Sequence, residues 1–124
     1  MIALTLVASL LAPAAGQPAA KPTIAQAKAA AAAWKQAVKA GRKAFTAQNY
    51  DAAAKHFQAA VDLDPNDAAT LGELGWIQYK AGRLPAAEAT LRRALLHVKA
   101  AKTEGMIRYN LGRVLEDQGK AVEA

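Results

Sequence analysis

The stretch YDAAAKHFQAAVDLDPNDAATLGELGWIQYKAG, residues 50–82, decides the fold. Apolar residues recur in it at spacings of three and four, which predicts one helix over 51–63 and another over 68–81. Asp64-Pro65-Asn66 separates them. Proline disfavours helical geometry in the residue before it, so the first helix is expected to end there. The stretch therefore predicts a helix–turn–helix unit.

This unit is repeated along the chain. A first set of residues recurs after 34 positions and a second set after 37. A period of about 34 residues is typical of arrays of helix–turn–helix repeats. An insertion of three residues around positions 99–104 accounts for the longer spacing, and we expect the helix before it to run longer than usual. The pairs are Gly41 with Gly75, Ala53 with Ala87, Phe57 with Leu91 and Ala60 with Ala94, then Gly75 with Gly112, Gly82 with Gly119 and Ala87 with Ala124.

The composition fits one small helical domain. The chain has 124 residues, is 53% hydrophobic with much alanine, and contains only 6% aromatic residues. Alanine is the best helix former and is poor in sheets, so helices are favoured over strands. The absence of cysteine excludes disulfides, thiolate metal sites and cysteine nucleophiles.

Positive charge is concentrated in the first third of the chain. The net charge is +6, and six of the sixteen basic residues precede Asp51, the first acidic residue. Such a segment is either a solvated helix face or a surface that attracts anions. The six are Lys21, Lys28, Lys35, Lys39, Arg42 and Lys43.

Residues 1–16 are predicted to be an export signal peptide. They carry an apolar run too short to span a membrane, followed by small residues suited to cleavage. No lysine or arginine precedes that run, and without a working signal the protein would be cytoplasmic. Residues 17–23 contain two prolines and are predicted to be a linker. We expect the mature chain in a bacterial periplasm or cell envelope.

Five helices are expected in residues 24–124. Thr23 is a suitable N-cap for a long helix over 24–47, whose alanine-rich part before Trp34 has little to pack. Asp67 can cap the third helix, and Gly82 can end it in the left-handed conformation. Pro85 suits the first turn of the fourth helix. Gly119 is expected to close the fifth, and the chain ends one turn into what should be a sixth.

From about Trp34 onward the sequence resembles the tetratricopeptide repeat family. The resemblance implies an all-α fold, an α-solenoid of antiparallel helix pairs, with repeats over about 34–67, 68–104 and an incomplete 105–124. We expect the sequence to be a piece of a longer array. The matching residues are Gly41, Tyr50, Ala53, Phe57, Ala60 and Pro65, then Leu71, Leu74, Gly75, Gly82, Ala87 and Ala94, and finally Leu111, Gly112, Gly119 and Ala124.

The small residues of this pattern have a physical role. Gly41, Gly75 and Gly112 let paired helices approach closely, and Phe57 and Leu91 fill the remaining space. Truncating a fully buried Phe57 to alanine should cost about 3–5 kcal/mol of stability.

No catalytic arrangement is visible, so we expect no enzyme, no cofactor and no metal. His56 and His97 lie on different predicted helices, and neither has a second histidine one turn away. Ser9 is the only serine and lies in the predicted signal. Asp62, Asp64 and Asp67 suit turn chemistry better than a calcium loop.

The resemblance implies a concave groove lined by the first helix of each repeat. Aromatic rings and long cations on such a surface suit a peptide, with rings as anchors and arginine for carboxylates. Trp76 either anchors a ligand or packs on the neighbouring repeat. The groove residues are Lys35, Val38, Arg42, Phe45, Trp76, Tyr79, Tyr109 and Arg113, with Ala69, Gly72 and Met106 beside them.

We therefore expect a non-catalytic interaction scaffold that binds a protein or peptide, with no small-molecule substrate. One alternative is a binder of anionic membranes or nucleic acid through the basic N-terminal helix. Another is an accessory helical part of a longer enzyme.

Overall fold

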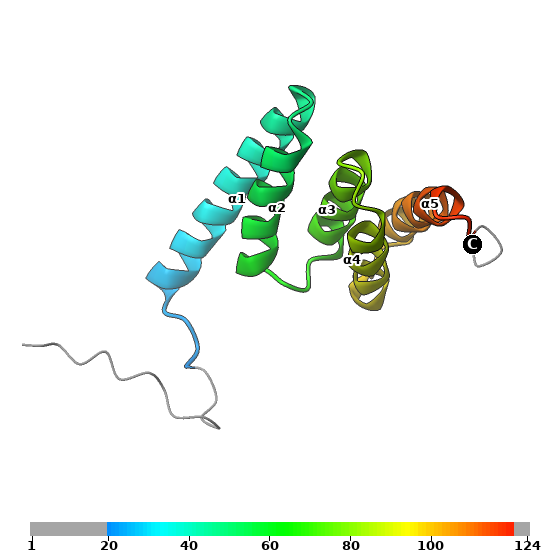
Figure 1. Ribbon diagram of the computed structural model, residues 1–124. Coiled ribbons are helices and arrows are strands. Elements are labelled where there is room, and N and C mark those ends of the chain that lie inside the picture. Colours follow the sequence, from blue (N-terminus) through cyan, green and yellow to red (C-terminus); the bar gives the residue numbers. More distant parts are fainter. Residues whose placement is uncertain (1–19, 121–124) are drawn as a thin grey trace, which may run out of the picture.

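Five helices form an array in the computed structural model, which describes residues 20–120. They are α1 (Ile24–Thr46), α2 (Tyr50–Leu63), α3 (Ala68–Lys80), α4 (Leu84–His97) and α5 (Ala101–Asp117). Helices α1 and α2 pair, α3 and α4 pair, and α5 packs on both members of the second pair (Figure 1). The described part of the chain contains no strand. The all-α solenoid expected from the sequence is confirmed.

The start of α1 is held by its cap rather than by packing. The Thr23 hydroxyl accepts a hydrogen bond from the Gln26 backbone N–H at 3.1 Å, and the Gln26 side chain accepts one from the Thr23 N–H at 2.8 Å. These two bonds satisfy two backbone donors that a helix start leaves free. From Ile24 to Ala33 all residues except the half-buried Ala30 are exposed. The first turns of α1 therefore depend on capping and alanine propensity.

The same turn ends α1, α3 and α5. The residue in the left-handed conformation is Gln48 (φ 60°) in the first, Gly82 (φ 80°) in the second and Gly119 (φ 74°) in the third. In each turn the next backbone N–H donates to a carbonyl five residues back, at 2.7–2.9 Å. These bonds satisfy carbonyls at the helix end. The spacings of 34 and 37 residues are thus visible in the backbone itself. Only the first turn uses a residue other than glycine.

Two glycines bring the paired helices into close contact. A Cβ atom built on Gly41 would lie 2.4 Å from Cδ2 of the Phe57 ring, and one on Gly75 would lie 2.5 Å from Cγ of Leu91. Phe57 and Leu91 are both fully buried. The predicted role of these two glycines is confirmed. For Gly112, no described heavy atom other than its chain neighbours and the nearby backbone of its own helix lies within 4 Å of an added Cβ.

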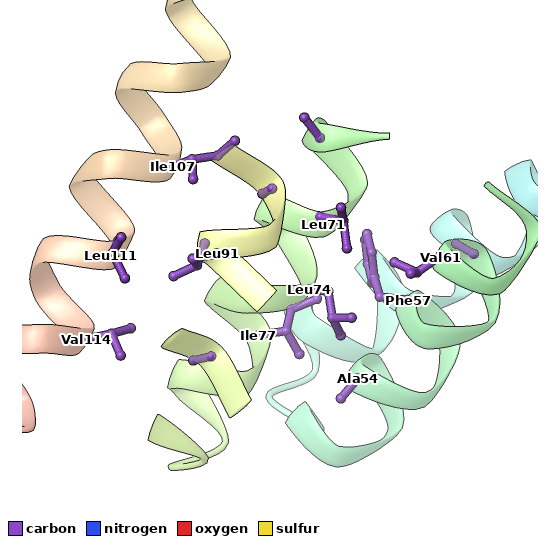
Figure 2. Close-up of a cluster of buried hydrophobic side chains, with 14 of the residues drawn as sticks. Ala54, Phe57, Val61, Leu71, Leu74, Ile77, Leu91, Ile107, Leu111 and Val114 are labelled. Atoms are coloured by element: carbon purple, nitrogen blue, oxygen red, sulfur yellow. The ribbon is translucent and has the colours of Figure 1, made fainter. Parts of the chain in front are cut away.

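The core runs through the array without a break (Figure 2). Each helix contributes an inward face of small and branched residues, and the largest fully buried side chains are Phe57, Leu71, Leu91, Ile107 and Leu115. No repeat can bury this apolar face alone, so stability comes from stacking neighbours.

The three-residue insertion lengthens α5 rather than α4, so the expectation of a longer fourth helix was wrong. Helices α2 and α4 both have 14 residues, whereas α5 has 17 and α3 has 13. Val98 takes an extended ψ of 138° and stops α4. Helix α5 then begins at Ala101, where Glu104 and Arg108 form an ion pair one turn apart at 2.8 Å. Residues 101–104, assigned to the second repeat, therefore belong to α5.

We expect Gly75→Ala to lower the free energy of unfolding by about 1–3 kcal/mol, because the new methyl group collides with the buried Leu91 side chain. Gly105→Ala is the matched control, since Gly105 is helical and has open space at the Cβ position. It should raise stability by about 1 kcal/mol through helix propensity. Urea denaturation followed by circular dichroism measures both. Equal effects of the two variants would contradict the close contact.

We expect Gln48→Gly to raise the free energy of unfolding by about 1 kcal/mol, because left-handed geometry costs a residue with a Cβ atom about 1–2 kcal/mol. The reciprocal variant, Gly82→Gln, should lower it by a similar amount. Thermal unfolding measures both changes. A destabilising Gln48→Gly would show that the glutamine side chain has a role of its own in this turn.

Candidate functional site

A pocket of about 460 Å³ opens between the first helices of the repeats, and its lining is mainly apolar. Helices α1, α3 and α5 supply most of its lining, and Phe57 of α2 also lines it. The lining residues are Arg42, Phe45, Thr46, Phe57, Gly72, Glu73, Trp76, Ile77, Met106 and Asn110.

The repeat register explains why these side chains meet. Arg42, Trp76 and Arg113 occupy the same position in successive repeats, at spacings of 34 and 37. Equivalent residues of stacked repeats point to the same side of the array, because each repeat has the same internal geometry. We call this side, lined by α1, α3 and α5, the inner face.

The eight predicted groove residues are distributed along the inner face. Arg42, Phe45 and Trp76 line the large pocket. Lys35 and Val38, with Arg42, line a second hollow of about 290 Å³. Val38 is 6% exposed and packs into the core, so it offers a ligand little surface.

The other three predicted residues lie further along α3 and α5. The Tyr79 hydroxyl donates a hydrogen bond to the Asp117 carboxylate at 2.6 Å, which joins these two helices. Tyr109 is 63% exposed. Hydrogen bonding with Tyr79, and then the proximity of Tyr109, raise the pKa of Arg113, which stays positively charged on an exposed site.

One ion pair crosses the inner face from α1 to α3. The Arg42 guanidinium donates two hydrogen bonds to the Glu73 carboxylate, from Nη2 to Oε1 at 2.6 Å and from Nε to Oε2 at 3.1 Å. Hydrogen bonding to Glu73, and then the negative charge of its carboxylate, raise the pKa of Arg42. The side chains are 63% and 32% exposed, so solvent screens the attraction. The pair lies at the pocket and can exchange partners with a ligand.

Aromatic rings gather at the pocket and beyond it. Trp76 and Tyr79 stack with their ring centroids 5.1 Å apart, and Lys80 Nζ lies 5.8 Å from the Trp76 centroid. Phe45 and Tyr50 lie 5.4 Å apart in a tilted pair. Trp76 is half-buried and contacts its own helix neighbour, with part of its surface left on the pocket wall. This placement leaves the indole accessible to a ligand.

Three polar residues of the pocket, Thr46, Glu73 and Asn110, were missed by the sequence reasoning. Glu73 and Asn110 line it, and they occupy the same repeat position as Lys39. That position lies between those of Val38 and Arg42, which were both assigned to the inner face. The 34- and 37-residue spacings, applied to Lys39, would have found Glu73 and Asn110.

Within residues 20–120 no three histidine, cysteine, aspartate or glutamate side chains converge on a possible metal site. His56 is exposed and His97 is half-buried. None of the described helices is both long and apolar enough to cross a membrane.

The fold and the inner face define a helical-repeat protein. Residues 44–101 match the family model described as tetratricopeptide repeat. This match and the five-helix array identify residues 44–101 as tetratricopeptide repeat. No curated protein shows a significant match to the sequence. The repeat class indicates a protein–protein interaction scaffold.

We expect Glu73→Gln to change the free energy of unfolding by less than about 1 kcal/mol, because the Arg42–Glu73 pair is largely solvated. Urea denaturation at low and high salt measures the change. A loss several times larger would mean that the ion pair holds α1 against α3, and that Arg42 is not available to a ligand.

Proposed function

We propose that this protein is a non-catalytic scaffold that binds a polypeptide partner through the inner face. The observation that carries the proposal is the pocket between α1, α3 and α5, whose mainly apolar lining also includes aromatic rings and the charged Arg42 and Glu73. Its volume lies in the range of ordinary ligand pockets, about 300–1,000 Å³. Repeats present such extended surfaces because their stacking curves the array.

The side chains of this face suit a peptide. Binding energy in protein interfaces comes mostly from a few aromatic and arginine side chains that meet apolar anchors in pockets. Trp76 and Phe45 supply rings at the pocket, and Arg42 supplies the guanidinium. Met106 adds a flexible apolar wall that is 43% exposed. A polarizable methionine adapts to side chains of different shape.

We further propose that the partner is met in a bacterial periplasm or cell envelope. Support comes only from the apolar run of residues 1–16. These residues, like the counterpart of Ala87 at Ala124, lie outside the part of the chain that the structure describes.

A second candidate function is binding of an anionic surface, a membrane or nucleic acid, through α1. The helix carries Lys28, Lys35, Lys39, Arg42 and Lys43 and no acidic residue. Binding of this kind is steeply salt-dependent. However, α1 lacks the broad apolar face of a helix that lies in a membrane surface, since Ile24 is its only exposed large hydrophobic residue.

Selection of random peptides displayed on phage against the whole chain tests the main proposal. We expect selected peptides to shift amide signals of α1, α3 and α5 in two-dimensional NMR spectra. Trp76→Ala should weaken their binding about tenfold or more, as loss of an aromatic anchor does.

Leu96→Ala is the control, because Leu96 is 81% exposed on α4 and lines none of the described pockets. It should leave the affinity unchanged. Peptides whose binding is indifferent to Trp76→Ala, or that perturb α2 and α4 instead, would remove the inner face from the proposal.

A further inference from the structure

Positively charged side chains form a line along α1 that leads to the large pocket. Lys28, Lys35, Lys39 and Arg42 follow one another at spacings of seven, four and three, which places them on one face of α1. Their stripe runs along the helix and ends at the large pocket, which Arg42 lines. Among residues 20–120, no carboxylate pairs with Lys28, Lys35 or Lys39.

The stripe and the pocket form one continuous surface. Lys35, Lys39 and Arg42 line the smaller hollow of about 290 Å³, and Arg42 also borders the larger one. A peptide lying across both hollows would meet cations along one part of its length and an apolar pocket along the next part. Glu73 is the only acidic side chain that lines either hollow, and it is already paired with Arg42.

We propose that the inner face recognises an acidic polypeptide segment with a single large apolar side chain. The apolar side chain enters the pocket, and carboxylates beside it lie along Lys35, Lys39 and Arg42. This inference rests on the proposed function and adds the chemistry of the partner. The occupant follows from charge complementarity, because opposite charges steer a ligand and reject partners of the wrong sign.

The surroundings of the stripe favour a peptide over nucleic acid. Proteins that bind single strands stack bases on open aromatic rings. Here Trp76 and Tyr79 stack on each other, with Lys80 over the tryptophan ring, so each ring has lost part of its free surface. Phe57 and Ile77 belong to the lining of the pocket, and this apolar lining suits an apolar side chain better than a base that must stack on an open ring.

Glu73 has a defined role in this arrangement. It holds Arg42 by two hydrogen bonds and places the only negative charge in the pocket lining. An incoming carboxylate must displace the Glu73 carboxylate from Arg42, and the negative charge of Glu73 also repels it. Removal of this charge should therefore strengthen the binding of an acidic ligand. Misfolding would weaken binding, so a gain in affinity cannot come from it.

Four synthetic peptides test the ligand's chemistry. They are GSEESLEESG, the same peptide with serine in place of leucine, and versions with glutamine or lysine in place of every glutamate. Titration of the whole chain, followed by two-dimensional NMR, gives each dissociation constant. We expect the first peptide to bind tightest and the loss of leucine to weaken it about tenfold or more, as expected for a buried apolar side chain. The glutamine version should bind severalfold more weakly, and the lysine version should not bind.

Three protein variants test the roles of the residues. Glu73→Gln should tighten binding of the acidic peptide severalfold, and Lys39→Glu should weaken it severalfold. Lys55→Glu is the control, since Lys55 is exposed on α2, lines neither hollow and undergoes the same charge change. It should have little effect. Equal effects of Lys39→Glu and Lys55→Glu would show that the attraction depends only on the net charge of the protein. That result would overturn the role assigned to the stripe.

Other outcomes would overturn the inference and leave the proposed function standing. The inference is overturned if the lysine peptide binds more tightly than the glutamate peptide, or if replacing leucine leaves the affinity unchanged. The proposed function still stands in either case if binding of the phage-selected peptides depends on Trp76. Tighter binding of an oligothymidine strand or anionic vesicles than of any peptide would instead assign the stripe to nucleic acid or membrane. Loss of the Trp76 dependence itself would remove the proposed function.

Discussion

The structure depends on a helix backbone lying directly against a large buried side chain. At Gly41 the Phe57 ring, and at Gly75 the Leu91 side chain, occupy the space that any Cβ atom would need. Dispersion attraction falls steeply with separation, so these contacts set the spacing within each helix pair. The Phe57 ring also lines the pocket between the inner helices. The same side chain therefore fixes the pairing of α1 with α2 and supports the pocket from within the core, where it is fully buried.

Repeated and unrepeated positions of the array have different roles. The packing positions keep their character from one repeat to the next, as in the left-handed turn residues and the buried alanines. The inner-face positions change. Arg42 is followed by Trp76 and Arg113, and Lys39 by Glu73 and Asn110. A solenoid needs uniform packing to stack, but its exposed face has no such requirement. The chemistry of the inner face therefore varies from repeat to repeat in this chain, whereas the packing between helices is repeated.

Much of the fold could be predicted because its signals are local. The Thr23 and Asp67 caps, the stop at Asp64 and the turn at Gly82 each depend on residues within one helical turn. The insertion could not be placed in this way, since either neighbouring helix can absorb three residues and the extended backbone at Val98 decides between them. The Arg42–Glu73 pair could not be predicted from the sequence either, because it joins residues 31 positions apart through tertiary structure. Val38 illustrates the same limit, since its helical face alone did not reveal that it is buried in the core.

The exposed start of α1 has a thermodynamic consequence. Between Ile24 and Ala33 this helix has almost no tertiary contact, so its order there follows a helix–coil equilibrium rather than the cooperative melting of the array. Lys28 lies in this segment. Any ion that settles beside it must also restrict a fraying backbone, and that entropic loss grows on warming. The outer end of the cationic stripe therefore holds its counterions more loosely than the end near Arg42, and more so in a warm solution than in a cold one.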